Sequence, residues 1–160
     1  MAGSKGRGRQ ADDGGRRRAI VTPVRATIAS DFTAGFKVQQ QILDAAQRHG
    51  FNEQSLFAIK IAVEEALVNA IKHGNKLDPD KRVMIDATIS PNEAEISIED
   101  EGPGFDRGSV PDPLAEENLE KPSGRGILLI ESYMSQVKWD HGGRRVRMVK
   151  KNNDVKRRTA

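Results

Sequence analysis

The segment EEALVNAIKHGN, residues 64–75, places polar side chains that could do chemistry inside an expected helix. Glu65 and Asn69 are four residues apart, so in a helix they lie one turn apart and point the same way. A carboxylate and an amide oxygen both suit Mg²⁺, which usually keeps several waters and takes phosphate oxygens as further ligands. Because Asn is a mediocre helix former, the pattern indicates either a hard-cation site or a solvated polar strip.

A second motif, IEDEGPGFD, follows at residues 98–106. Asp100 ends an expected strand, and Gly102 and Gly104 stand just beyond it. Glycines at this point can bring the backbone close to a flat ligand. Asp100 is placed to accept a hydrogen bond from an exocyclic amine, such as that of adenine. The alternative is an ordinary turn after a strand.

A third motif, SGRGI at residues 123–127, opens an expected helix. Gly124 and Gly126 would present free backbone N–H groups at a helix N-terminus, where the helix dipole also favours an anion such as phosphate. Arg125 could add a charge-assisted contact. The segment is neither a Walker A sequence nor a dinucleotide fingerprint, and its alternative interpretation is a flexible loop that enters a helix.

The expected elements that position these motifs alternate between helices and strands. An extended segment with Ile20, Val24 and Ile28 contains Pro23, which suggests an edge strand. A first helix begins at Ser30 or Asp31 and ends at Gly50. Further strands are expected at 83–89 and 95–100, and QVKWD and RRVRMVK predict a closing hairpin around HGG. We therefore expect an α+β fold, a two-layer sandwich of a mixed, mainly antiparallel sheet with helices on one face.

A second helix is expected from the cap Asn52 to about His73, with Gly74 and Asn75 as stop signals. At about 100° per residue, its side chains divide into two adjoining apolar stripes and one narrow polar strip. The first stripe holds Leu56, Ile59, Val63, Ala66, Leu67 and Ala70, the second holds Phe57, Ile61, Val68 and Ile71, and the polar strip holds Glu65, Asn69, Lys72 and His73. Glu64 points toward the second apolar stripe.

The formal net charge of +3 hides an uneven distribution along the 160 residues. Residues 1–18 carry a net +4 and residues 144–160 a net +7, so the residues between them carry −8. We interpret this as an acidic domain, residues 19–151, between two disordered basic tails, 1–18 and 152–160. The tails suit solubilising charge, or contact with nucleic acid or a partner.

The composition excludes several classes of protein. The chain has no cysteine, so it has no disulfide and no thiolate metal site, which fits a reducing compartment. No apolar run approaches the ~20 residues that a membrane span needs, and no apolar signal-peptide stretch follows the basic N-terminus. We expect a soluble cytoplasmic protein that does not contact a membrane.

The order and spacing of the three motifs are more specific than any one of them. E-x-x-x-N on a helix, then D-x-G-x-G-F, a variable segment, and G-R-G-I opening a helix resembles the GHKL ATPase superfamily and its Bergerat ATP-binding fold. The stretch DPLAEENLEKPSGRGILLIESYMSQV is similar to the stand-alone anti-sigma factor serine/threonine kinases of the RsbW and SpoIIAB type. The resemblance covers about residues 20–150.

The resemblance implies a role for each motif residue. Asn69 matches the residue that holds Mg²⁺ on the phosphates of ATP, and Glu65 matches the general base that takes a proton from a serine hydroxyl. His73 follows in the same motif, where it contacts the nucleotide or packs. Asp100 matches the acid that binds adenine. The nucleotide-contacting residues implied by the other two motifs are Gly102, Gly104, Gly124, Arg125, Gly126 and Ile127, and residues 106–123 match the mobile lid.

One departure from the family pattern lies in the closing hairpin. Many relatives carry a Gly-Thr pair there whose Thr contacts the site, whereas this chain has Arg144 and Arg145 where that Thr would fall. The departure puts the nucleotide affinity in question.

Three functions remain open. The resemblance implies a kinase that sequesters a sigma factor and phosphorylates a STAS-domain anti-sigma antagonist, and it suggests a homodimer. An ATP-binding switch without catalysis is the alternative, although such a switch would need no Glu65. The basic tails suggest a nucleic-acid-associated ATPase, but the acidic domain lacks basic residues interleaved with aromatics, which speaks against direct nucleic-acid binding.

Overall fold

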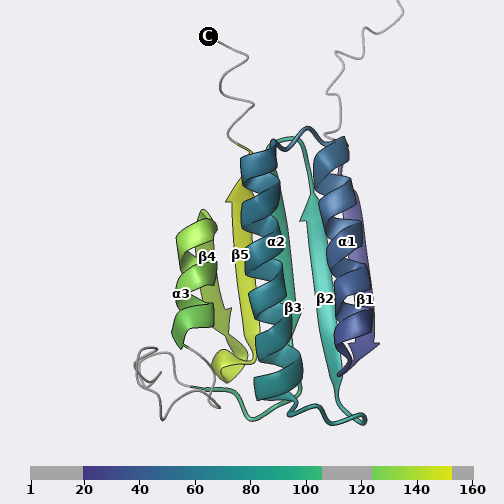
Figure 1. Cartoon of the computed structure of the whole chain (residues 1–160), viewed down its shortest axis with the longest axis vertical. Helices are drawn as coiled ribbons and strands as arrows, with labels where there is room; N and C mark the ends of the chain where they lie inside the picture. The colour runs from purple at the N-terminus through teal and green to yellow at the C-terminus, as the bar shows by residue number, and fades with distance from the viewer. Residues whose placement is uncertain (1–19, 106–123, 153–160) are drawn as a thin grey trace, which may run out of the picture.

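A computed structural model of the chain describes residues 20–105 and 124–152 (Figure 1). The expected tail 1–18 and lid 106–123 lie outside these residues, as does the expected tail 152–160 except for Asn152. The elements follow one another as β1 (Thr22–Ala29), α1 (Phe32–Arg48), α2 (Glu53–Val68), η1 (Asn69–Gly74), β2 (Arg82–Ile89), β3 (Glu93–Glu99), α3 (Gly124–Tyr133), β4 (Gln136–Asp140), η4 (His141–Gly143) and β5 (Arg145–Lys151).

The five described strands form one sheet in the order β1-β2-β3-β5-β4. Each neighbouring pair is antiparallel, where the sequence suggested some parallel pairing. The helices α1, α2 and α3 cover a single face of this sheet (Figure 1). The predicted two-layer α+β sandwich is therefore confirmed, and so is the edge position of the strand that contains Pro23. None of the described helices is long and apolar enough to cross a lipid bilayer.

The core lies between the two layers and follows the predicted periodicities. Alternate residues of β2 and β3 point toward the helices and are 3% exposed or less: Val83, Ile85, Ala87, Ile89, Ala94, Ile96 and Ile98. From α2, Ile59, Val63 and Leu67 are 1% exposed or less, which confirms the first apolar stripe. On the second stripe Ile71 is fully buried, but Phe57 is 52% exposed. The Phe57 ring packs edge-to-face against the ring of Tyr133 in α3.

The helix boundaries are fixed by local hydrogen bonds that the sequence indicated. Asp31 caps α1, and its carboxylate accepts the backbone N–H groups of Thr33 and Ala34. Gly50, at a φ of 85°, turns the chain after α1 in the left-handed region that favours glycine. Asn52 caps α2, since its Oδ1 accepts the N–H of Ser55 at 2.7 Å.

The predicted second helix to about His73 is confirmed in its extent, but its last turn is π-helical rather than α-helical. The α-helix ends at Val68, and residues Asn69–Gly74 form the π-helical segment η1. Here the N–H of Asn75 donates to the carbonyl of Ala70, five residues back, at 2.9 Å. A π-helical turn holds an additional residue and is frequent at functional sites. The residue that follows this turn, Asn75, lies at a fully buried position.

Asn75 is fully buried and joins three strand ends to the end of η1. Its Nδ2 donates to Ser30 Oγ at 3.0 Å, just after β1, and to the carbonyl of Arg82 at 2.9 Å, at the start of β2. Its Oδ1 accepts the N–H of Glu101 at 2.8 Å, just after β3. Asn75 therefore fixes where the chain leaves β3, next to Asp100.

We predict that Asn75→Ala destabilises the protein by about 3 kcal/mol. The substitution removes the buried hydrogen bond to Ser30 Oγ and the part-buried hydrogen bonds to the carbonyl of Arg82 and the N–H of Glu101, and each hydrogen bond contributes about 0.5–1.5 kcal/mol. Urea denaturation monitored by circular dichroism measures the change. Gln41→Ala, which removes an exposed amide from α1, is the control and should change the stability by less than about 0.5 kcal/mol. Equal stabilities of the two variants would contradict the buried role of Asn75.

Candidate functional site

A cleft opens where the C-terminal end of α2, η1, the end of β3 and the start of β5 meet, at the lower end of the sandwich in Figure 1. It holds about 430 Å³ of empty space, part of which is open to solvent. The residues that line it are Ala66, Asn69, Ala70, His73, Gly74, Ile98, Asp100, Pro103, Gly104, Phe105, Trp139, Gly143, Arg144 and Val146. The cleft thus brings together Asn69, His73, Asp100 and Gly104 from two of the three sequence motifs.

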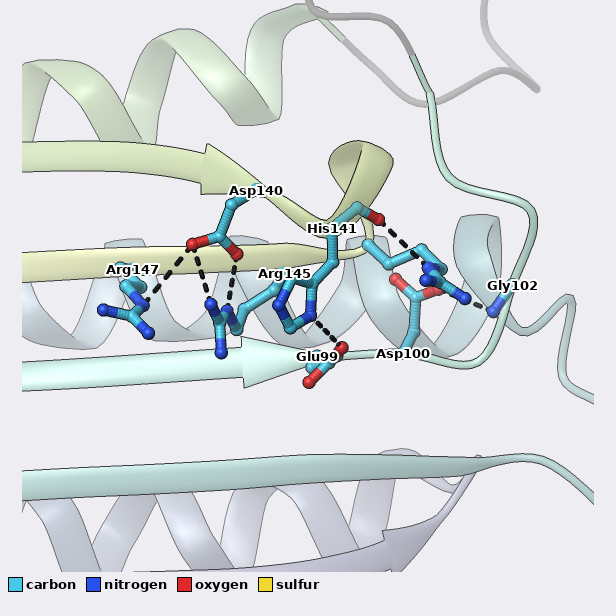
Figure 2. Close-up of polar contacts among 8 residues, drawn as sticks. Glu99, Asp100, Gly102, Asp140, His141, Arg145 and Arg147 are labelled. Carbon is cyan, nitrogen blue, oxygen red and sulfur yellow. Dashed lines mark hydrogen bonds and ion pairs between the residues drawn. The ribbon is translucent and has the colours of Figure 1, made fainter.

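Asp100 follows β3 directly, and its Oδ1 accepts the backbone N–H of Gly102 at 2.8 Å (Figure 2). Burial raises the pKa of Asp100 to about 6, although the Gly102 hydrogen bond and the nearby charge of Arg144 act in the opposite direction. A desolvated carboxylate gains when a ligand donates a hydrogen bond to it. Its position therefore suits the exocyclic amine of a base.

Two glycines make the position of Asp100 possible. A Cβ on Gly74 would overlap the carboxylate of Asp100, and a Cβ on Gly102 would overlap the backbone carbonyl of Gly74. The end of η1 and the chain after β3 therefore pack backbone against backbone. Gly102 is buried and does not line the cleft, so its described contacts are those that hold Asp100. From the sequence Gly74 is expected only as a helix stop, although its place directly after His73 in the first motif is a signal that could have indicated this contact.

Glu65 and Asn69 face the start of α3. A Cβ on Gly126 would lie 2.9 Å from Glu65 Oε2 and 3.9 Å from Asn69 Nδ2. Asn69 Nδ2 is buried and has no hydrogen-bond partner among the residues that the structure describes. A solvated polar strip does not account for a buried amide, because a solvated amide would be hydrogen-bonded to water. The Nδ2 group of Asn69 can therefore donate a hydrogen bond to a ligand.

The ionisable groups of the predicted polar strip differ in their surroundings. Burial raises the pKa of Glu65, the charge of Glu64 raises it further, and Arg125 lowers it. His73 lines the cleft, where burial and the charge of Lys72 lower its pKa, so this imidazole is neutral at pH 7. Lys72 itself is exposed. The raised pKa makes Glu65 a stronger base than an ordinary glutamate, which favours a proton-accepting role.

The third motif forms the start of α3, as expected, with Gly124 as its first residue. Gly126 is the member of this motif that approaches Glu65 and Asn69. Arg125 is exposed at the rim of this region. Ile127 is fully buried and does not line the cleft, so its side chain serves packing. A contact between its backbone N–H and a phosphate stays a prediction.

The closing hairpin forms the opposite wall of the cleft. Gly104 and Gly143 have φ of 77° and 90°, and a Cβ on either would overlap backbone of the facing segment. The N–H of Phe105 donates to the carbonyl of Gly142 at 2.9 Å. The chain after Asp100 is therefore attached to the turn η4, which sequence spacing alone did not predict.

The structure distinguishes Arg144 from Arg145, either of which could fall where the family's Thr contacts the site. Arg144 lines the cleft, where its charge acts on Asp100. Arg145 instead pairs with Asp140 through two hydrogen bonds of 2.5 and 2.9 Å (Figure 2). It lines a shallow groove with Arg25 and Asp86 on the face of the sheet that no described helix covers. Of the two arginines, Arg144 is thus the one that lines the cleft.

The donor set of the site limits the kind of metal that it could hold. Among residues 20–105 and 124–152, no group of three or more His, Asp or Glu side chains could enclose a metal ion. Mg²⁺ is commonly bound by one or two protein ligands together with substrate phosphates and water. The amide oxygen of Asn69, which lines the cleft, is a ligand of the kind that such a site uses.

A family model described as "Histidine kinase-like ATPase domain" matches residues 29–150. The chain belongs to this family. The match spans all three motifs and confirms the predicted resemblance to the GHKL ATPases. As a member of this ATPase family, the chain uses ATP.

Individual relatives of this histidine kinase-like ATPase carry more specific names. A "Serine-protein kinase RsbW" of Listeria monocytogenes is 30% identical over 105 residues, 61% of this chain and 67% of that protein. An "Anti-sigma F factor" of Clostridium perfringens is 38% identical over 87 residues, 52% of this chain and 61% of that protein. The matched regions therefore make up about two thirds of the length of these relatives.

A solved structure supports the fold. The RsbU and RsbW domains of Rv1364c from Mycobacterium tuberculosis match with a TM-score of 0.55 and 16% identity. The match covers 82% of this chain and 32% of that one, so it concerns about a third of the larger protein. It confirms the predicted architecture.

We predict that ATP binding weakens as the pH falls through about 6. In the free protein the Asp100 pKa of about 6 means that the carboxyl is ionised at pH 7 and protonated at pH 5. The protonated form must lose its proton before it can accept the amine hydrogen bond as a carboxylate. At pH 5 this costs about tenfold in affinity.

Isothermal titration calorimetry between pH 5 and 8 measures this dependence, with Asp100→Asn as the control. The variant should bind ATP more weakly by about 1–3 kcal/mol at pH 7. It should keep only the pH dependence that the phosphates of ATP contribute. Identical pH profiles, or an unchanged affinity at pH 7, would show that Asp100 does not contact the base.

Proposed function

We propose that the chain is an anti-sigma factor serine/threonine protein kinase of the cytoplasm. In this proposal it binds Mg·ATP, sequesters a sigma factor, and phosphorylates a serine of a STAS-domain antagonist of that anti-sigma factor. The names of the relatives, a serine-protein kinase and an anti-sigma factor, support both halves of the proposal. The observation that carries the catalytic half is the placement of Glu65 beside Asn69, facing the start of α3.

The two ends of the site suit the two ends of ATP. Asp100 lies in the cleft, with glycine backbone of η1 and of the chain after β3 packed around it, as recognition of a flat base requires. Asn69 lines the same cleft from the start of η1, and Gly126 approaches it from the N-terminus of α3. Backbone N–H groups at a helix N-terminus favour phosphate. We therefore place the base at Asp100 and the phosphates between Asn69 and α3.

Glu65 stands one helical turn before Asn69, with its Oε2 on the side of Gly126. A serine hydroxyl that entered at this point would meet a carboxylate close to the phosphates. The raised pKa of Glu65 makes it a better proton acceptor in the transfer step, in which the hydroxyl oxygen forms a bond to the γ-phosphorus and the bond to the ADP oxygen breaks. Mg²⁺, held through Asn69, would supply neutralisation of the phosphate charge.

The binding-only alternative differs from the kinase in what it asks of Glu65. A switch that only holds ATP has no use for a partly desolvated carboxylate beside the phosphates, and burial of such a group is unfavourable. The raised pKa of Glu65 thus favours catalysis. A homodimer, which the family resemblance suggests, would be compatible with either function.

We predict that Asn69→Ala abolishes the tightening of ATP binding by Mg²⁺ and leaves the fold intact. The substitution removes the amide oxygen that would hold the ion, and alanine favours the helix more than asparagine does. Calorimetric titration of ATP with and without Mg²⁺ measures the effect, and circular dichroism reports the fold. Unfolding of the variant, or wild-type binding of Mg·ATP, would assign Asn69 to packing.

We predict that Glu65→Gln lowers phosphoryl transfer at least ~100-fold, the lower end of the usual contribution of a general base. Affinity for Mg·ATP should stay within about threefold of wild type, or ~0.7 kcal/mol, because the base contacts the incoming serine. Phosphoserine on STAS-domain candidates encoded near the gene, quantified by mass spectrometry, measures transfer. Binding of the sigma factor should persist.

Glu64→Gln is the matched control, since it removes a neighbouring carboxylate from the same helix and should leave transfer largely intact. Two results would refute the kinase proposal. Wild-type protein that binds ATP but phosphorylates none of the candidates would be a switch. Wild-type transfer rates in Glu65→Gln would show that Glu65 is not the base.

A further inference from the structure

Two buried side-chain polar atoms lack a hydrogen-bond partner within the part of the chain that the structure describes, Asn69 Nδ2 and Trp139 Nε1. Both residues line the cleft described above. Asn69 has a role in the proposed function, as the residue that would hold Mg²⁺. Trp139 belongs to none of the three motifs and has no assigned role.

An indole N–H is a hydrogen-bond donor only, and a buried donor without an acceptor costs about 1–3 kcal/mol. Buried polar groups in native proteins are nearly always paired, so each exception needs an explanation. A Phe or Leu at position 139 would fill apolar space without this cost. The presence of the only tryptophan of the chain at the cleft therefore indicates an acceptor that arrives with a ligand.

The position of Trp139 restricts what that acceptor can be. Trp139 lies in β4 opposite Val146 of β5, on the side of the sheet that packs against the core. It contributes to the same cleft as Asp100, whereas Glu65 lies outside the cleft lining, near Gly126. Asn69 lines this cleft too, but the Trp139 ring packs against Phe105, in the segment that follows Asp100, which associates Trp139 with the end of the site where the base is placed.

One internal alternative exists for the indole N–H. The rings of Trp139 and Phe105 pack edge-to-face, with centroids 5.1 Å apart and planes inclined by 68°. If the N–H pointed at the face of the Phe105 ring, it would gain an N–H···π contact, which is a weak substitute for a hydrogen bond to oxygen or nitrogen. The two arrangements give opposite spectroscopic signatures, so an experiment can separate them.

We propose that Trp139 is a base-contacting residue whose indole N–H donates a hydrogen bond to a ring nitrogen of the bound purine. The proposal rests on the proposed function, because it takes the ligand to be ATP. Asp100 accepts from the exocyclic amine and Trp139 donates to a neighbouring ring acceptor. The pair therefore matches adenine, which carries an amine donor flanked by ring nitrogens, and it determines the choice of base.

The single tryptophan makes the test direct, because ¹⁵N-labelled protein shows one indole N–H signal in a proton–nitrogen correlation spectrum. Titration with Mg·ATP should move this signal downfield in a saturable way, as expected when a hydrogen bond forms. Tripolyphosphate with Mg²⁺ should leave the signal in place, since it carries no base. ATP analogues in which a ring nitrogen beside the amine is replaced by carbon, 1-deaza-ATP and 7-deaza-ATP, should identify the acceptor.

Biosynthetic replacement of Trp139 by benzothienylalanine provides the matched variant, since sulfur takes the place of the N–H in a ring of nearly the same shape. Affinity for ATP should fall about tenfold, or ~1.4 kcal/mol, while affinity for tripolyphosphate should not change. Equal loss for both ligands would indicate a structural role and overturn the proposal. Trp139→Phe, which also deletes ring volume, should behave in the same direction and provides a second variant.

Failure of this proposal can be distinguished from failure of the proposed function. If calorimetry shows ATP binding while the indole signal does not move, Trp139 does not contact the base and only the present proposal is overturned. An upfield signal in the free protein that ATP leaves unchanged would assign the N–H to the Phe105 ring, with the same consequence. If wild-type protein binds no ATP, the proposed function and the role of Trp139 are refuted together.

Discussion

The site depends on one close approach, that of the end of η1 to the chain just after β3. Gly74 and Gly102 pack backbone against backbone, and the Asp100 carboxylate lies against the Cα of Gly74 in space that a Cβ would fill. The next residue after Gly74 is Asn75, whose buried amide binds the ends of β1, β2 and β3. Two adjacent residues therefore have these two roles: Gly74 makes room for the carboxylate of Asp100, and Asn75 holds the strand ends.

The pKa shifts of the ionisable groups have different causes at the cleft and on the open face of the sheet. At the cleft, burial moves Asp100 and Glu65 toward higher pKa and His73 toward lower pKa, so all three groups are shifted toward their neutral forms. On the open face, the hydrogen bonds from Arg145 lower the pKa of Asp140 (Figure 2). Desolvated groups without strong partners raise the free energy of the empty site. A ligand that supplies hydrogen-bond donors and charge offsets this cost when it binds.

Much of the fold could be predicted from local patterns because local physics sets them. The strict alternation of Val83, Ile85, Ala87 and Ile89 indicates a strand with one buried face, and these residues are buried in the sandwich. Asp31 and Asn52 cap the helices at the positions where their side chains favour a helix start. The turn HGG closes the hairpin of β4 and β5. Each of these signals needs only neighbours in the chain or across one strand pair.

The sequence by itself determined the chemical inventory of the protein: which residues could bind a base, phosphate or metal, in what order and at what spacing. Only the tertiary structure decided their geometry. It converted the last turn of the second helix to η1, placed Arg144 rather than Arg145 at the cleft, assigned Ile127 to packing, and brought Trp139 to the same cleft as Asp100. The physical reason is that these outcomes depend on contacts between residues far apart in the chain, such as Gly74 with Gly102 and Phe105 with Gly142. Periodicity and local propensity carry no information about which distant backbones meet.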